Sequence, residues 1–283
     1  MTDHSGNTIV GQATSNPTSR TDRKPRPLHS ALRKGRGFIL PVLGILLLEG
    51  VVRVGLIPDY VMPPPSELVF SFIDLAHGPL WNDIAASLLR VLAGFIIGTA
   101  LAVIVGSVVG LSRNAEAWLD PTFQALRSVP SLAWVPLLLI WIGIDESSKV
   151  TLISIGAFFP MYLNLVAGIR NVDRKLVEVG TLYQYSRVRM VAKIILPAAL
   201  PSLLTGLRSG LSMAWLCVVA AELLAATNGI GYMLTDGRET SRPDLVLVAI
   251  ITLAVMGKIS DSLLKHLEQK ALYWRDSFNG DVQ

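Results

Sequence analysis

The stretch VLAGFIIGTALAVIVGSVVGLS, residues 91–112, decides the fold class because its 22 consecutive residues include no charged side chain. A helix needs about 20 mostly apolar residues to cross the hydrocarbon core of a bilayer. Two further stretches, residues 128–144 and 150–169, are free of charge over 17 and 20 positions. Buried helices of a soluble protein rarely run this long without a charge, so the sequence predicts three membrane-spanning helices.

Three more segments are long and apolar enough to span a bilayer, although each contains two charged residues. They are residues 38–57, 203–226 and 245–264. Charged side chains near the ends of a span can reach the interface with their polar heads. The composition agrees, since 51% of the 283 residues are apolar, 16% are charged and the mean hydropathy is +0.51. We therefore expect an all-α membrane protein with six transmembrane helices.

The net charge of +4 comes from the N-terminal segment, residues 1–36. This segment holds seven of the 25 Lys and Arg residues and two acidic residues, so the remaining residues carry a net charge of −1. A basic tail before a nearly neutral membrane body argues against nucleic-acid binding. Lys and Arg favour cytoplasmic loops, and a cytoplasmic N-terminus puts 17 of them inside and five outside. We expect both termini in the cytoplasm of an inner-membrane protein, a disordered tail over residues 1–36, and a retained helix, not a signal peptide, at residues 38–57.

Two rows of small residues at four-residue spacing predict close helix packing inside the membrane. Four residues turn a helix by about 400°, so each row forms one slowly winding ridge. The first row is Gly94, Gly98, Ala102, Gly106 and Gly110, and the second is Gly206, Gly210 and Ala214. Each ridge can pack against another helix of the same chain, or can contribute to a subunit interface or a transport pathway.

Four residues within the predicted spans are candidates for a transport pathway or for gating. Pro130 and Pro136 interrupt the third span, because proline removes a backbone donor and bends a helix, and a broken helix can line a pathway. Arg208 and Glu222 lie about 21 Å apart along the fifth span, so they cannot pair with each other. Ionisable side chains inside a membrane are functional candidates by default. A packing kink and a structural hydrogen bond are the alternatives.

The segment between the fourth and fifth spans, residues 173–197, is longer than a simple connector requires. Apolar residues recur at helical spacing in two sets, within 176–183 and 188–195, and charged residues flank both sets. Ser186 can cap the start of the second set. The segment therefore predicts two short amphipathic helices, with Pro197 at the start of the next span. Their apolar faces can lie against headgroups or the protein's own helix ends, or can dock a soluble partner.

This segment resembles the loop of type I ABC importer permeases, whose pattern is Glu-Ala-Ala, three residues, Gly, nine residues and Ile-x-Leu-Pro. Both spacings are kept, with three residues at 181–183 and nine at 185–193. The corresponding positions are Glu178, Val179, Gly180, Gln184, Ile194, Leu196 and Pro197. Two alanines and the glycine of the pattern are replaced here, and Gln184 stands at the turn between the helices. In that family the loop is the coupling helix, seated in a groove of the ATP-hydrolysing subunit. The resemblance implies that Glu178 orients this helix and that Pro197 sets the hinge to the span.

Further stretches extend the resemblance from about Trp81 to Leu267. SLLRVLAGF at 87–95 resembles the opening of the type I permease domain. LAWVPL at 132–137, IWIGI at 140–144, PAALP at 197–201 and AAELL at 220–224 resemble permeases for alkanesulfonates, taurine and nitrate. The resemblance implies a type I ABC importer permease (MetI-like) core at 81–267, after a first transmembrane helix and periplasmic segment at 37–80 and before a cytoplasmic tail at 268–283. The implied substrate is a small anion, first an aliphatic sulfonate or taurine, with nitrate, bicarbonate or a thiamine precursor as alternatives.

The resemblance also implies partners: two copies of an ABC ATP-binding subunit, a periplasmic or lipid-anchored substrate-binding protein, and a second copy of this chain. The chain lacks the G-x-x-x-x-G-K-[ST] phosphate loop, and its four scattered His and one Cys form no metal or nucleophile motif. We therefore expect no catalytic residue, metal or cofactor on this chain, with ATP on the partner subunit. The alternative class is a secondary carrier or channel without an ATPase, or a membrane scaffold. An amphipathic docking pair at 173–197 argues for the importer.

Overall fold

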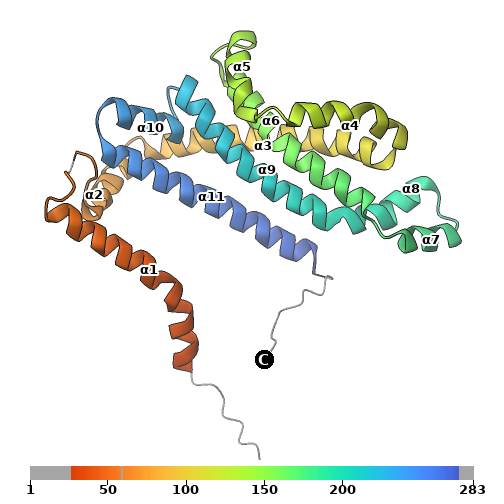
Figure 1. Cartoon of the computed structure of the whole chain (residues 1–283), viewed down its shortest axis with the longest axis horizontal. Helices are drawn as coiled ribbons and strands as arrows, with labels where there is room; N and C mark the ends of the chain where they lie inside the picture. The colour runs from red at the N-terminus through yellow and green to blue at the C-terminus, as the bar shows by residue number, and fades with distance from the viewer. Residues whose placement is uncertain (1–26, 59, 274–283) are drawn as a thin grey trace, which may run out of the picture. The chain divides into compact units, whose positions relative to one another are not determined.

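The computed structural model describes residues 27–58 and 60–273, with side chains from Ile39 onward (Figure 1). The chain divides into two units, Met1–Leu48 and Glu49–Gln283. The described part of the first unit belongs to a helix, α1, with bounds Pro27–Arg53. This helix begins ahead of the predicted first span, and residues 1–26 of the predicted tail lie outside the described residues.

Four helical segments in the described part of the chain are long and apolar enough to cross a membrane. They are α3 (Leu80–Leu111), α6 (Glu146–Arg170), the helical run Arg187–Ala225 that ends in α9 (Leu196–Ala225), and α11 (Pro243–Ala271). Each contains one predicted span, so four of the six are confirmed. A fifth is present if a bent helix pair counts as one span. The first predicted span, residues 38–57, falls mainly on α1, which is not among the four, so the count of six stays a prediction.

The predicted third span, residues 128–144, is broken. It contains the 3-10 turn η1 (Ser131–Trp134) and α5 (Val135–Trp141), and α4 (Arg113–Arg127) ends just before it. α4 meets the η1–α5 segment at 86°. Pro130 is extended at the break, whereas Pro136 occupies the first turn of α5, where a missing N–H leaves no bond unmade. The predicted bend is confirmed. If the bent pair is one span, α4 forms its first half and the span begins ahead of residue 128.

α6 packs against both α3 and α9 through the two ridges of small residues (Figure 1). A Cβ added at Gly94 would lie 2.6 Å from the Cβ of Ile153 on α6. A Cβ added at Gly98 would overlap the backbone oxygen of Ser154. Helices approach this closely only over small residues. Both ridges therefore pack within the chain, since Gly210 of the second ridge contacts α6 in the same way.

The buried core of the second unit follows this contact of three helices. Its largest apolar cluster joins Ile153 of α6 to Ala214, Cys217 and Val218 of α9. A second cluster joins α10 (Ile230–Glu239) to α11 and to α2 (Pro65–Ala76). Other faces of the long helices expose large apolar side chains, as expected for helices whose solvent is lipid. The two clusters hold the helices whose ends carry the candidate sites.

Candidate functional site

The predicted amphipathic helices of residues 173–197 lie together at one end of the second unit, which we call the loop end (Figure 1). They are α7 (Arg174–Leu182), the short α8 (Arg187–Met190) and a π-helical turn, η2 (Val191–Ile195). Asp173 caps α7 by accepting from the backbone N–H of Lys175, and Ser186 caps α8 by accepting from that of Arg189. The cap predicted at Ser186 is confirmed.

The turn between α7 and α8 depends on a left-handed residue, Gln184, whose φ is +53°. The backbone N–H of Tyr185 donates to the carbonyl of Gly180 at 3.0 Å, and that of Gln184 to Thr181 at 2.9 Å. These two bonds form a Schellman motif, which usually has glycine at the left-handed position. Gln184 occupies the glycine position of the family pattern, so the turn keeps the glycine-type backbone although the residue has changed.

The remaining pattern residues of α7 divide into a packed side and an exposed side. Gly180 is buried, and a Cβ there would lie 2.6 Å from both Ile194 Cδ1 and Met190 Sδ. Glu178 and Val179 are exposed, and the carboxylate of Glu178 makes no hydrogen bond or ion pair within the described part of the chain. α7 is therefore held by Gly180 against the following helix, and its other face is open.

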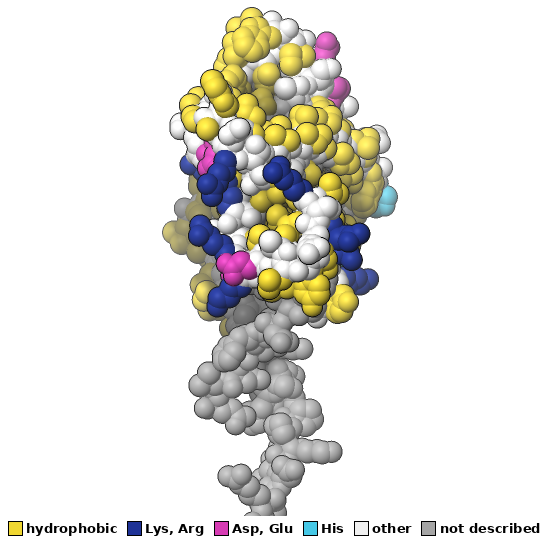
Figure 2. Space-filling view, turned by 90° about the vertical axis from the view of Figure 1, so that its right-hand side faces the viewer, with side chains coloured by type: hydrophobic (Ala, Val, Ile, Leu, Met, Phe, Trp, Pro, Cys, Tyr) yellow, Lys and Arg dark blue, Asp and Glu magenta, His cyan; other side chains and the backbone are white. Residues whose placement is uncertain are grey.

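The exposed surface of the loop end combines apolar and basic side chains. The exposed apolar residues are Leu176, Val179, Leu182, Tyr183 and Val188. Arg189 and Lys193 each lie 5.9 Å from the ring centroid of Tyr185. Figure 2 shows Lys and Arg side chains gathered around apolar surface on this end. Such a face suits a partner groove with an apolar floor and an acidic rim.

The second amphipathic piece and the fifth span are one helical run, Arg187–Ala225. α9, which carries the fifth predicted span, begins at Leu196 with Pro197 in its first turn, so the predicted start at Pro197 is confirmed to within one residue. Leu196 donates its backbone N–H to Val191, five residues back, just before Pro197. This π-type widening accommodates the proline ring, which would otherwise strain an α-helix. Leu196 and Pro197 thus lie within a continuous helical run that links the loop end to the membrane-spanning part.

The carboxylate of Glu222 is fully buried at the other end of α9. Arg90 of α3 donates to it at 2.7 Å, and Ser87 Oγ at 2.8 Å. The backbone N–H of Gly231, at the start of α10, donates at 2.8 Å. A buried charge is tolerated when it is paired and fully hydrogen-bonded. Glu222 thus makes the structural hydrogen bonds that were one alternative for it, and its role in gating stays a prediction.

Arg90 extends this cluster to α6. Its guanidinium donates to both oxygens of Glu146, at 2.6 and 2.8 Å, and to the backbone oxygen of Asn228 at 2.8 Å. Glu146 also accepts from Lys149 at 2.7 Å. The sequence analysis counted Arg90 and Lys149 among the five basic residues of the outer segments and span ends, and it did not predict these partners. Each directly precedes a charge-free run, and a helix that starts earlier than the run brings such a residue inside.

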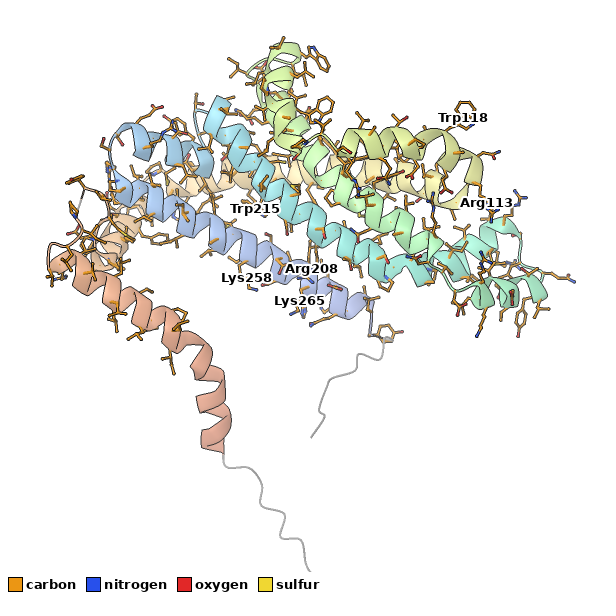
Figure 3. The ribbon with its side chains drawn as sticks, viewed as in Figure 1. Arg113, Trp118, Arg208, Trp215, Lys258 and Lys265 are labelled. Atoms are coloured by element: carbon orange, nitrogen blue, oxygen red, sulfur yellow. The ribbon has the colours of Figure 1, made fainter. Side chains whose placement is uncertain are left out.

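The other charged candidate, Arg208, lies between α9 and α11 (Figure 3). Its guanidinium donates to Asp261 at 3.0 Å and to Glu268 at 3.4 Å. Arg208 and Glu222 have different partners, which confirms that they do not pair with each other. The charges of two predicted spans therefore neutralise one another within the chain.

A cavity of about 570 Å³ lies beside the break in the third span. Pro130 and Ser131 line it together with Arg127, and Asn164 of α6 and Leu216 of α9 complete the wall. Pro136 is not among the lining residues. The cavity is mostly apolar, with a cation, a hydroxyl and an amide at its wall, which is a suitable lining for a small organic anion.

Comparisons with known proteins agree with this arrangement. The chain is 42% identical over 246 residues to a protein of Bacillus subtilis (strain 168) described as the aliphatic sulfonates transport permease SsuC, covering 87% of this chain and 89% of that one. It is 40% identical to the protein of the same description from Escherichia coli (strain K12), covering 89% and 97%. It is 35% identical to the taurine transport system permease TauC of the same strain, covering 82% and 86%.

The fold has a counterpart among solved structures. A chain of the inward-facing MetNI methionine ABC transporter superposes with a TM-score of 0.53 at 18% identity, covering 66% of this chain and 95% of that one. The all-α membrane fold is thus the MetI-like fold. The profile of one family, described as binding-protein-dependent transport system inner membrane component, matches residues 80–273. The chain belongs to this family of inner-membrane transport components.

Proposed function

We propose that the chain is the permease subunit of an ATP-driven importer that moves an aliphatic sulfonate or taurine across the inner membrane. Support comes from relatives at 35–42% identity that are described as permeases for these substrates. Sulfonates are small anions with an aliphatic part, and the cavity beside Pro130 combines apolar walls with Arg127. The chain itself binds no ATP in this proposal, because ATP belongs to a partner subunit.

The observation that carries the proposal is the continuity of Arg187–Ala225. One end of this run is the amphipathic loop end, and the rest crosses the packed helices. An ATP-binding subunit that holds α7 and α8 in a groove would therefore displace a membrane-spanning helix directly. Packed interfaces move as units, so such a displacement reaches the cavity that Leu216 lines.

The remaining partners follow from this assignment. Two ATP-binding subunits would dock at the loop ends of two copies of the chain, with both termini on the same cytoplasmic side. A substrate-binding protein would deliver the anion to the opposite end, where α10 and the Glu222 cluster lie. In this arrangement, Glu222 and Arg90 hold the outer ends of α3, α6, α9 and α10 together.

Reversal of Glu178 tests the docking step. Glu178→Arg reverses the charge of the carboxylate that in this proposal contacts the ATP-binding subunit, so we expect uptake to be abolished and the ATP-binding subunit to be lost on purification. Membrane insertion and thermal stability should be unchanged, because Glu178 is exposed and unpaired among the described residues. Glu67→Arg is the matched control, since Glu67 is also exposed and unpaired but lies on α2. Normal uptake by Glu178→Arg would contradict the proposal.

Growth of a strain that lacks the gene tests the substrate. We expect the chain, expressed with its partners, to restore growth on an alkanesulfonate or taurine as sole sulfur source, but not on nitrate as sole nitrogen source. Removal of ATP from reconstituted vesicles should stop uptake. Uptake that continues without ATP would assign the chain to the carriers or channels instead.

A further inference from the structure

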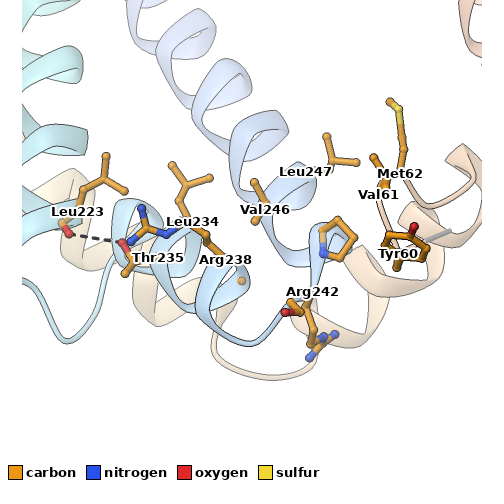
Figure 4. A pocket seen from close by; sticks show the side chains of 13 residues that line it. Tyr60, Val61, Met62, Leu223, Leu234, Thr235, Arg238, Arg242, Val246 and Leu247 are labelled. Carbon is orange, nitrogen blue, oxygen red and sulfur yellow. Dashed lines mark hydrogen bonds between the residues drawn. The ribbon is translucent and has the colours of Figure 1, made fainter. Parts of the chain in front are cut away.

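A second cavity, of about 630 Å³, lies beside α10, at the end of the second unit away from the loop end (Figure 1), and Figure 4 shows the side chains that line it. α10 and the start of α11 form one wall, and the segment 60–62 forms another. Leu234, Val246 and Leu247 supply apolar surface on the helices, and Val61 and Met62 supply it on the segment. The cavity is therefore an apolar trough between elements that are far apart in the sequence.

A strained turn places two arginines at the rim of this trough. Ser241 has a left-handed φ of +55° although it is not glycine. The backbone N–H of Arg242 donates to the carbonyl of Gly237 at 2.8 Å, which closes a Schellman motif at the end of α10. A left-handed backbone is unfavourable for a residue that has a side chain. The tight reversal is kept despite this cost, and it brings Arg238 and Arg242 to one cavity.

The two arginines differ in how their charge is satisfied. Arg242 donates to Asp244 at 2.8 Å, and this hydrogen bond raises the pKa of the Arg242 guanidinium above its usual value. The Arg238 guanidinium makes no hydrogen bond or ion pair with any residue that the structure describes. It is exposed and lines the cavity, beside the hydroxyls of Thr235 and Ser241. An exposed cation next to an apolar trough has the features of a site for an anion that carries a hydrocarbon chain.

We propose that this cavity, which we call the rim pocket, binds an aliphatic monoanion, with the anionic head on Arg238 and the chain along Leu234, Val246 and Met62. Two sources share this chemistry: a free alkanesulfonate, and the head and first methylenes of an anionic phospholipid. The first source rests on the proposed function, in which the pocket is the entry site for the substrate. The binding itself does not depend on transport.

Binding is measured on the purified full-length chain in nanodiscs of phosphatidylcholine, which carries no net charge. The probes are ethanesulfonate, butanesulfonate and hexanesulfonate, with hexylammonium as the probe of opposite charge. We expect affinity to rise about two- to fourfold for each added methylene, because each buries apolar surface. Hexylammonium should not bind. Equal affinity for the three sulfonates, or binding of hexylammonium, would overturn the proposal.

Two variants assign the binding to the rim pocket. Arg238→Gln should weaken hexanesulfonate binding about tenfold through loss of a charge-assisted bond. Val61→Trp should weaken it by filling the trough from an exposed segment, with little effect on folding. Arg113→Gln is the matched control, because Arg113 is exposed and lies beyond the far end of α3. Unchanged affinity in both variants would place the binding elsewhere and overturn the proposal.

The lipid arm uses nanodiscs with increasing phosphatidylglycerol and mass spectrometry of retained lipid. Sulfonate binding that persists with phosphatidylglycerol identifies a free alkanesulfonate as the ligand. Retention of phosphatidylglycerol that Arg238→Gln abolishes identifies the phospholipid. Absence of both refutes the rim pocket as an anion site. Failure of sulfonate uptake in cells, with binding intact, would instead refute the proposed function and leave the rim pocket standing.

Discussion

Arg90 and Glu222, 132 residues apart in the chain, form an ion pair with an Nη1–Oε1 distance of 2.7 Å, and their side chains are 6% and 0% exposed. The pair crosses from α3 to α9 and is continued to α6 through Glu146. Neither charge can be rehydrated without separating these helices. The packing of α3, α6 and α9 at this end of the unit therefore depends on these two side chains.

Removal of one partner should be severe. Arg90→Ala leaves the Glu222 carboxylate buried and unpaired, and we expect a loss of about 3–5 kcal/mol in stability. Thermal unfolding of the purified chain in detergent measures the loss. Arg208→Ala is the matched control, because the Arg208–Asp261 pair is 37% and 33% exposed on its two sides and should contribute no more than about 1 kcal/mol. Similar losses of stability in the two variants would show that burial of an ion pair does not determine how much stability is lost when one partner is removed.

The contact between α3 and α6 should not accept a single methyl group at Gly98. A Cβ there meets backbone rather than a movable side chain end, so Gly98→Ala should cost about 1–3 kcal/mol by forcing the helices apart. Gly257→Ala is the control, because nothing lies within 4 Å of a Cβ added there on α11. That variant should be neutral or gain up to about 1 kcal/mol from helix propensity. The two variants are compared by denaturing each in detergent and monitoring the loss of monodisperse protein.

The turn at Gln184 should improve when the family's glycine is restored. Gln184→Gly removes the cost of a left-handed side-chain residue, so we expect a gain of about 1 kcal/mol with uptake retained. Tyr183→Gly is the control at the preceding position, where φ is −79° and glycine should cost about 0.5–1 kcal/mol. Opposite shifts in melting temperature are expected. Destabilisation by Gln184→Gly would mean that the Gln184 side chain makes a stabilising contact in the complex.

The basic rim of the loop end should make association with the ATP-binding subunit depend on charge. Arg187→Glu with Arg189→Glu should weaken co-purification, and raising the salt concentration should weaken the wild-type complex, because exposed charges are screened. Lys270→Glu, an exposed cation on α11, serves as the control. If the complex persists at high salt and the double variant still co-purifies, the docking depends on the apolar residues alone.

The sequence was sufficient for features that depend on local periodicity. A charge-free run such as residues 91–112 becomes a helix wherever it lies in a membrane, because its backbone groups can be satisfied only within the segment. The four-residue spacing of Gly94 and Gly98 likewise predicts a packing ridge from one helix alone. The loop at 173–197 was recognised from its own spacing, and its caps at Asp173 and Ser186 formed as their residue types allow.

Features that join distant segments could not be predicted from the sequence in this way. No local pattern relates Arg90 to Glu222, since their pairing depends on how α3, α6 and α9 pack. The prolines predicted a bend in the third span, but neither its 86° angle nor the place of α4 beside it. The left-handed φ at Gln184 could not be predicted, because the residue at this position is not glycine.

The long apolar helices and their small-residue faces can be predicted from the sequence, because each depends on the periodicity of a single segment, and the loop can be recognised from the spacing of its motif. Only the packed structure shows which charges neutralise each other, that α6 packs against both α3 and α9, and where the two cavities described above lie. These depend on contacts between residues more than 50 positions apart, such as Arg90 with Glu146 and Arg208 with Asp261. Buried charges find partners by proximity in space, and that proximity exists only after the helices have packed.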